Sequence, residues 1–156
     1  MKPLFPVLAA FAIALAGCAS NPNKSMTPEQ VMGALSQHHW QLRNATDSDG
    51  HYIQELFARR DKPLELGFRD DRVHVANACN VLNGSVAIED GKLAVKQMVS
   101  TMMACADPAV SRLDRAISSR LEKPSKYRID EDANPPTLTL VTASGDMLVF
   151  KATDVD

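Results

Sequence analysis

Histidines are the first residues to consider, because neutral imidazole binds transition metals and also serves as an acid–base group near neutral pH. His38 and His39 are adjacent, and His51 follows in the next stretch of the chain. Adjacent residues of a strand point to opposite faces, so His38 and His39 cannot both bind one ion without a bulge. No H-E-x-x-H motif accompanies them. We interpret them as surface histidines and expect no metal site and no cofactor.

Catalytic motifs are absent from the sequence as a whole. It has no G-x-S-x-G nucleophile elbow, no P-loop and no dinucleotide-binding fingerprint. The pairs Asp70-Asp71 and Glu131-Asp132 could supply acid–base groups, but their surroundings are typical of solvated turns. We expect a protein that is not an enzyme, with a hydrolase of unrecognised active site as the alternative.

Cys18, the first of three cysteines, follows an apolar segment. Lys2 gives a positive start, residues 4–16 carry no charge, and Gly17 is small, which is the pattern of a secretory signal peptide. The apolar run is about 13 residues long, shorter than the roughly 20 that a transmembrane helix needs. We therefore expect residues 1–17 to be a signal peptide and not a membrane-spanning helix.

The sequence Leu15-Ala16-Gly17-Cys18 resembles the lipobox of bacterial lipoproteins. The resemblance implies that the chain is cut before Cys18 and that this cysteine carries acyl chains such as palmitate. Ala19 follows, where an Asp would commonly signal retention in the inner membrane, so an outer-membrane lipoprotein facing the periplasm is implied. Residues 18–26 would form the lipidated tether and residues 27–156 one folded domain. An ordinary secretory cleavage site that happens to precede a cysteine is the alternative.

The charge of the mature chain argues against some partners. Removing residues 1–17 leaves 139 residues, with 16 basic and 19 acidic side chains and a net charge of about −3. This balance gives no electrostatic reason to bind nucleic acid or anionic lipid head groups. We expect no nucleic-acid partner.

Cys79 and Cys105 are the remaining thiols. Neither belongs to a C-x-x-C motif, and neither has a His or Cys beside it at ligand spacing, so a redox-active pair and half of a metal site are the weaker alternatives. Export to an oxidising compartment favours a disulfide between them. Closing a loop of about 27 residues would stabilise the fold by roughly 3.5 kcal/mol on the chain-entropy model.

Two helices are predicted. Thr27-Pro28-Glu29-Gln30 has the spacing of a capping box with proline at the first helical position, which predicts a short helix ending near Gln37. Asp107-Pro108 opens a longer amphipathic helix. Its apolar stripe consists of Val110, Leu113, Ile117 and Leu121, and its largely outward residues are Arg112, Arg115, Ser119 and Arg120.

Strands account for the rest of the prediction. Alternation places Trp40 and Leu42 on one side of a strand, and residues 51–62 fit a helix and an irregular strand equally well. The other predicted strands are residues 64–68, 73–75, 85–89, 92–96, 127–130, 137–142 and 147–151, in which Asp90-Gly91 is the strongest hairpin signal. The sum is an α+β protein: an antiparallel curled sheet or half-open β-barrel packed on one amphipathic helix, plus a short N-terminal helix.

The segment from Asn77 to Cys105 carries a specific pattern. Its members are Cys79, Asn80, Gly84, Thr101, Met103 and Cys105. This pattern resembles the META domain family, in particular its HslJ-like bacterial lipoproteins, over about residues 36–152. The resemblance implies a small β-rich fold with one helix, an envelope location and a link to stress and novobiocin resistance. It brings no established reaction or catalytic residue. The family often has Arg where this chain has Met102, so a role for that guanidinium does not carry over.

The motif also has a physical interpretation. Asn80 and Gly84 suit a tight backbone turn beside the disulfide. Met98, Met102 and Met103 are adaptable apolar residues that we expect in the core, with a lipid or peptide groove as the alternative. We expect membrane attachment through the N-terminal lipid, together with a lipid or envelope protein bound in an apolar groove or at a strand edge.

Overall fold

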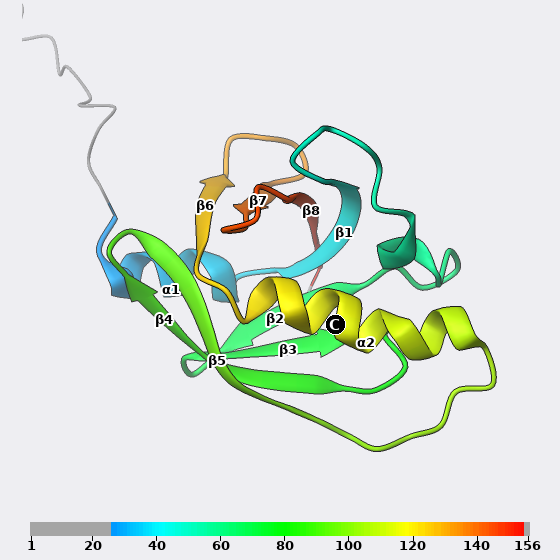
Figure 1. Ribbon diagram of the computed structural model, residues 1–156. Coiled ribbons are helices and arrows are strands. Elements are labelled where there is room, and N and C mark those ends of the chain that lie inside the picture. Colours follow the sequence, from blue (N-terminus) through cyan, green and yellow to red (C-terminus); the bar gives the residue numbers. More distant parts are fainter. Residues whose placement is uncertain (1–25, 155–156) are drawn as a thin grey trace, which may run out of the picture.

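The structure, a computed structural model, describes residues 26–154 as eight strands, two α-helices and one 3₁₀ helix (Figure 1). The elements are α1 (Pro28–Ser36), β1 (His39–Thr46), η1 (Gln54–Phe57), β2 (Glu65–Arg69), β3 (Arg72–Ala76), β4 (Leu82–Glu89), β5 (Lys92–Ser100), α2 (Pro108–Leu121), β6 (Ser125–Asp130), β7 (Thr137–Val141) and β8 (Met147–Thr153). The predicted signal peptide (1–17), the predicted lipid attachment site Cys18 and all of the predicted tether but its last residue lie outside the described residues.

The strands form one antiparallel sheet that closes on itself. Each strand pairs with the next along the chain, and β1 pairs with β8 from His39 to Thr46, so the order β1 to β8 runs round a closed barrel. The weakest junction is β5 with β6, where only Lys92 pairs with Lys126 and Leu93 with Ser125. The predicted α+β fold is confirmed, and the curled sheet closes into a ring.

The inside of the barrel is an apolar core that follows the alternation of the strands. Trp40, Leu66, Leu138 and Phe150 are completely buried. The indole Nε1 of Trp40 donates a hydrogen bond to the carbonyl oxygen of Leu35 at 2.8 Å, which fixes the end of α1 to the start of β1. Burying these side chains supplies the main driving force for folding.

Both predicted helices are present, with the expected caps. Thr27 and Gln30 form the reciprocal capping box of α1, and the Asp107 carboxylate accepts from the backbone N–H of Ala109 at the start of α2. The α2 stripe packs into the core, where its buried members are Leu113, Ala116, Ile117 and Leu121. The prediction that Arg120 faces outward is wrong, because its side chain is only 16% exposed.

The ambiguous residues 51–62 form no strand. The 3₁₀ helix η1 occupies their middle, and Leu56 on it is buried in the core. This short helix packs against α2. A single turn of 3₁₀ helix is too short to show a helical period. The spacing of its apolar residues therefore fits an α-helix and a strand equally well.

Gly84 lies within β4, and the prediction that it forms a turn is wrong. The pairing of β4 with β5 shifts its register between Asn83 and Ser85, and a Cβ atom at Gly84 would stand 2.7 Å from Val95 Cγ1 and 3.2 Å from the carbonyl oxygen of Lys96. The glycine is required by the close approach of the two strands at this bulge.

Gly84→Ala tests this packing. We expect it to lower the free energy of unfolding by about 1–3 kcal/mol, because the added methyl group meets backbone as well as side chain. Gly33→Ala is the matched control: Gly33 lies in α1 with open space around it, so the same change should raise stability by about 0.5–1 kcal/mol. Urea unfolding measures both, and equal effects would contradict the packing argument.

Candidate functional site

The family-like segment is built round a disulfide. Cys79 and Cys105 are bonded, with their Cα atoms 5.9 Å apart, which confirms the predicted pairing. The bond joins the middle of the β3–β4 connection to the segment that leads into α2. Ser111 on the first turn of α2 donates to the carbonyl oxygen of Cys105 at 3.1 Å, which holds that segment to the helix.

Asn80 forms a polar bridge next to the disulfide. Its Nδ2 donates to Asp114 Oδ2 at 2.7 Å, and its backbone N–H donates to Asp114 Oδ1 at 3.0 Å. Its Oδ1 accepts from the Thr101 hydroxyl at 2.8 Å and from the backbone N–H of Met103 at 2.6 Å. Asn80 lies at the end of a bend over residues 77–80 and is not in the left-handed conformation. Its side chain joins three segments of the chain.

Thr101 completes the same network. Its Oγ1 accepts from the backbone N–H of Val81 at 3.2 Å, and its own backbone N–H donates to the carbonyl oxygen of Val81 at 3.1 Å. The motif residues Asn80 and Thr101 therefore satisfy one another and the neighbouring backbone. Groups engaged in this way are structural and are not free to do acid–base chemistry.

The methionines divide into two groups. Met98 is half-buried and packs against the core, as predicted. Met102 is 100% exposed and Met103 is 65% exposed, so the prediction that they lie in the core is wrong. The Asn80 network holds the backbone at Met103 on the outside of the barrel, which keeps these side chains out of the core.

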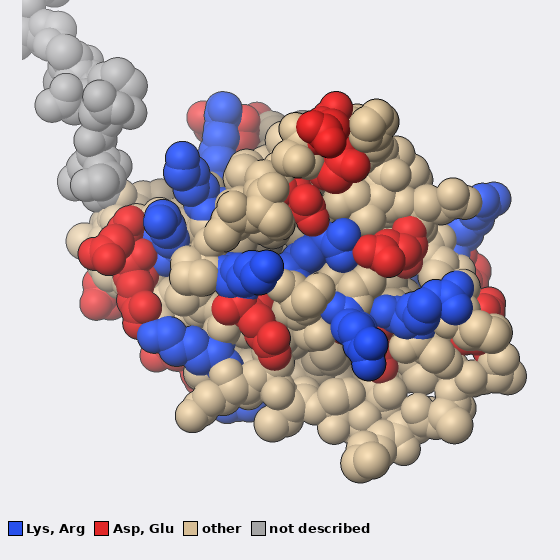
Figure 2. All heavy atoms as spheres, in the orientation of Figure 1, with Lys and Arg blue, Asp and Glu red and all other residues tan. Residues whose placement is uncertain are grey.

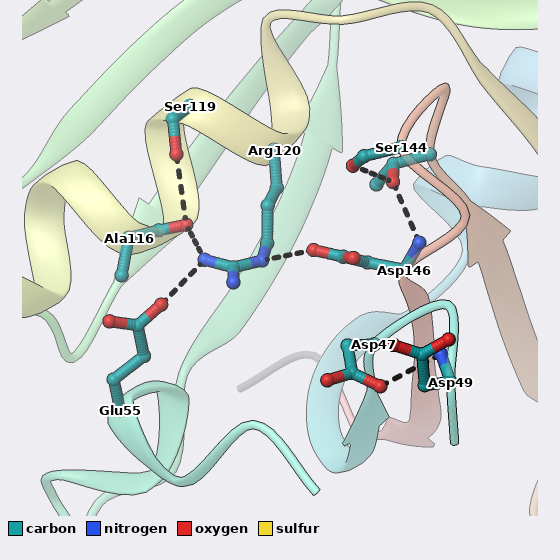
Figure 3. Close-up of polar contacts among 9 residues, drawn as sticks. Asp47, Asp49, Glu55, Ala116, Ser119, Arg120, Ser144 and Asp146 are labelled. Carbon is teal, nitrogen blue, oxygen red and sulfur yellow. Dashed lines mark hydrogen bonds and ion pairs between the residues drawn. The ribbon is translucent and has the colours of Figure 1, made fainter. Parts of the chain in front are cut away.

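Arg120 occupies a second polar cluster, on the far end of α2 (Figure 3). Its Nε donates to Asp146 Oδ2 at 2.8 Å, its Nη1 contacts Glu55 Oε1 at 2.9 Å, and Nη1 also donates to the carbonyl oxygen of Ala116. The Asp146 side chain is only 14% exposed. The guanidinium thus ties α2 to η1 and to the β7–β8 turn. No local sequence pattern predicts this cluster, because the three segments lie far apart along the chain.

Three serines line the hollow beside the Arg120 cluster. Among the described residues, none of the three hydroxyls lies next to a group that could act as its general base. Ser111 donates to Cys105, Ser119 donates to the carbonyl oxygen of Ala116, and Ser144 pairs with the hydroxyl of Thr142. Among the described residues, the histidine rings contact Glu65, Asp47 and Asn83 and no hydroxyl or thiol. A Ser–His relay is therefore absent from this part of the chain.

The three histidines singled out in the sequence do not come together. His38 packs edge-on against the Trp40 ring. His39 on β1 contacts Glu65 on β2. His51 lies in the loop with Asp47 and Asp49. Hydrogen bonds, above all from the backbone of His51, lower the pKa of the half-buried Asp47. The acidic residues Asp70, Asp71, Glu131 and Asp132 are exposed, as expected of turns.

No helix among residues 26–154 combines the length and the apolar character that crossing a bilayer requires.

Comparison with known proteins shows the family to which this chain belongs. The profile of the family described as "META domain" matches residues 33–155. The chain belongs to the META domain family. A relative of this META domain, "Heat shock protein HslJ" of Escherichia coli (strain K12), is 32% identical over 147 residues, covering 94% of this chain and 93% of the relative.

Solved structures share the fold of this META domain. An NMR structure of a protein from Burkholderia xenovorans superposes with a TM-score of 0.67 at 24% identity, covering 97% of this chain and 99% of that one. A crystal structure of a DUF4847 family protein from Bacteroides vulgatus ATCC 8482 gives 0.52 at 12% identity, covering 81% and 99%. At this level of identity the likeness concerns the fold alone.

Asn80→Asp tests the bridge. We expect it to lower the free energy of unfolding by about 2–3 kcal/mol, because a carboxylate replaces the Nδ2 donor opposite Asp114 and leaves its oxygen unpaired. Adding Asp114→Asn should recover part of the loss by restoring a donor. The exposed Asn44→Asp is the control and should be near neutral. Denaturant unfolding measures all four proteins, and a neutral Asn80→Asp would contradict the bridge.

Arg120→Ala tests the second cluster. We expect a loss of about 2–4 kcal/mol in unfolding free energy, since the change leaves the mostly buried Asp146 without its partner. Glu55→Ala removes only the 52% exposed arm of the cluster and should cost less than about 1 kcal/mol. Thermal or urea unfolding of the two variants separates the arms, and equal losses would show that Asp146 is not the dominant partner.

Proposed function

We propose that this META domain is a non-catalytic lipoprotein of the outer membrane that faces the periplasm and rests an apolar surface on the phospholipid leaflet. Residues 1–17 are the signal peptide, Cys18 carries the lipid, and residues 18–26 tether the domain. The proposal extends to a role in envelope stress and novobiocin resistance, for which the similarity to "Heat shock protein HslJ" is the support.

The observation that carries the proposal is a set of exposed apolar side chains beside the disulfide. This set, the methionine rim, consists of Val81, Val99, Met102 and Met103, which are 38%, 60%, 100% and 65% exposed. Contact between Val81 and Thr101 links the two segments that carry the rim. Exposed apolar residues that gather in one place indicate an interaction surface.

The backbone that carries the methionine rim is fixed at the surface. The disulfide joins the two segments that carry the rim, and Asn80 bonds the backbone of Met103 to Asp114 on α2, so the backbone under these side chains is held at the surface. A fixed apolar surface loses little conformational entropy when it binds.

The charge around the rim supports a lipid surface as its occupant. Residues 97–106 carry no charge, and α2, which holds Asn80 through Asp114, also presents the exposed Arg112 and Arg115. The segment between β5 and α2 runs along the lower edge of Figure 1, and the same edge of Figure 2 is mostly uncharged, with Lys and Arg atoms and some Asp and Glu atoms above it. An apolar edge below basic side chains suits acyl chains below phosphate head groups. The net charge of the whole chain, about −3 after removal of residues 1–17, does not reveal these basic side chains beside an uncharged segment.

Because the tether keeps the domain at the membrane, a weak contact between the methionine rim and the bilayer is sufficient. A domain attached to the membrane by its own N-terminus has a high effective concentration at that surface. The rim then sets the orientation of the domain rather than its attachment.

Vesicle binding tests the rim without the lipid. The chain from residue 19, exported with a cleavable signal, contains every element of the barrel and is mixed with vesicles of phosphatidylethanolamine and phosphatidylglycerol. We expect sedimentation with the vesicles, and about a tenfold loss of binding in Met102→Ser/Met103→Ser, because two apolar side chains leave the bilayer. Met147→Ser, at an exposed methionine outside the rim, is the matched control and should bind as the parent.

Three outcomes would overturn the lipid surface as occupant: no sedimentation, equal binding by the rim variant, or an equal loss with Met147→Ser. If the rim variant instead loses a crosslink to an envelope protein in cells, the occupant is a protein.

Cys18→Ser tests the anchor separately. We expect the wild-type chain in the outer-membrane fraction and the variant released from it, since one cysteine carries the acyl chains. Fractionation of cells with an antibody to the domain measures this, and membrane retention of the variant would contradict lipid anchoring. Novobiocin sensitivity of the same strains then tests whether the anchored form supports resistance.

A further inference from the structure

We propose that His39 and His74 form a binding site for a divalent transition-metal ion on the outer face of the barrel. The site is independent of the methionine rim and of the lipid anchor. Imidazole nitrogen is a preferred ligand of Zn²⁺ and Cu²⁺, which defines the class of ion.

The register of the sheet brings the two histidines to one face. His39 on β1 pairs with Gly67 on β2, Gly67 pairs with His74 on β3, and His74 pairs with Asn83 on β4. Residues in register across neighbouring strands point to the same side, here the outside. His39 and His74 are thus two strand spacings apart, or about 10 Å between Cα atoms, and the residue between them has no side chain.

Gly67 leaves the space between the rings open. An ideal Cβ at Gly67 would lie 3.7 Å from both Cδ2 and Nε2 of His39, so the imidazole of His39 already leans over this glycine. The two histidines, Gly67 and Asn83 line one hollow of about 680 Å³ on this face. An ion between the rings therefore meets no side chain of β2 at this position.

Both imidazoles are oriented as metal ligands are. His39 Nδ1 contacts the carboxylate of Glu65 at 3.0 Å, and His74 Nδ1 contacts the amide Oδ1 of Asn83 at 3.1 Å. These oxygens only accept, so each neutral ring carries its proton on Nδ1 and keeps the Nε2 lone pair free. Metal-binding histidines donate their second nitrogen to a carboxylate or carbonyl oxygen in the same way.

The charges round the hollow do not oppose a cation. Glu65 and Asp70 offset Arg69 and Arg72 among the lining residues. Two imidazoles fill only part of a tetrahedral shell, which leaves positions for water or for a group of a bound partner.

Four histidines in the chain provide the controls. Calorimetric titration of the chain from residue 19 with ZnCl₂ at pH 7.5 should show one ion bound, reversed by EDTA. His39→Gln and His74→Gln should each weaken binding by about tenfold or more, and Glu65→Gln by about tenfold through loss of the orienting carboxylate. His38→Gln and His51→Gln should change it less than about twofold.

Gly67→Val separates loss of the site from loss of the fold. Gly67 is not in the left-handed region and a Cβ there makes ordinary contacts, so the strand accommodates valine while its side chain fills the gap between the rings. We expect an intact fold by circular dichroism and loss of Zn²⁺ binding.

Imidazole ¹H–¹⁵N spectra give a second readout. Before metal is added, His39 and His74 should show the Nδ1–H tautomer, and Zn²⁺ should shift their Nε2 signals. Absence of binding, or binding that survives both substitutions, would overturn the proposal. Loss of binding in His51→Gln alone would also overturn it, since the ion would then lie in the Asp47–His51 loop.

Discussion

Two residue pairs are all that join β5 to β6, and the closure of the barrel depends on what compensates for this short junction. Helix α2 lies between these strands in the sequence and buries its apolar stripe in the common core. It is fixed at both ends: by the disulfide and the Asn80–Asp114 bridge near its start, and by Arg120 near its end. These contacts tie the helix to the β3–β4 connection, to η1 and to the β7–β8 turn, while its apolar stripe packs into the core.

This constraint explains why the family motif contains no free chemical group. The side chains of Asn80 and Thr101 form hydrogen bonds with the backbone and with Asp114, and Gly84 allows β4 and β5 to pack closely. The same contacts that anchor α2 also hold the segment before it on the surface. Met102 and Met103 are exposed because the backbone between the disulfide and Thr101 is pinned. The structural motif thus presents the surface that we propose for membrane contact.

Local patterns were sufficient for the fold, and the disagreements arise where contacts are long-range. Alternation, the two capped helices and Asp90-Gly91 identify nearly every element, because each depends on neighbours in sequence. Helical periodicity places Arg120 on the outer face, because it cannot reveal Glu55 and Asp146 on distant segments. Likewise, methionine composition suggests core packing, and only the Asn80 bridge explains the exposure of Met103. The alignment of His39, Gly67 and His74 required the sheet register, which the sequence alone does not specify.

Amide hydrogen exchange of the oxidised and the reduced protein tests most directly the claim that the motif pins the rim onto a barrel that is stable by its own core. On reduction of Cys79–Cys105, exchange should accelerate most in residues 76–82 and 99–106 and clearly less in β1, β7 and β8, which lose only the global stabilisation that the disulfide supplies. Equal acceleration throughout the barrel would show that the disulfide supports the whole fold. Unchanged exchange in residues 99–106 would show that it does not hold the rim.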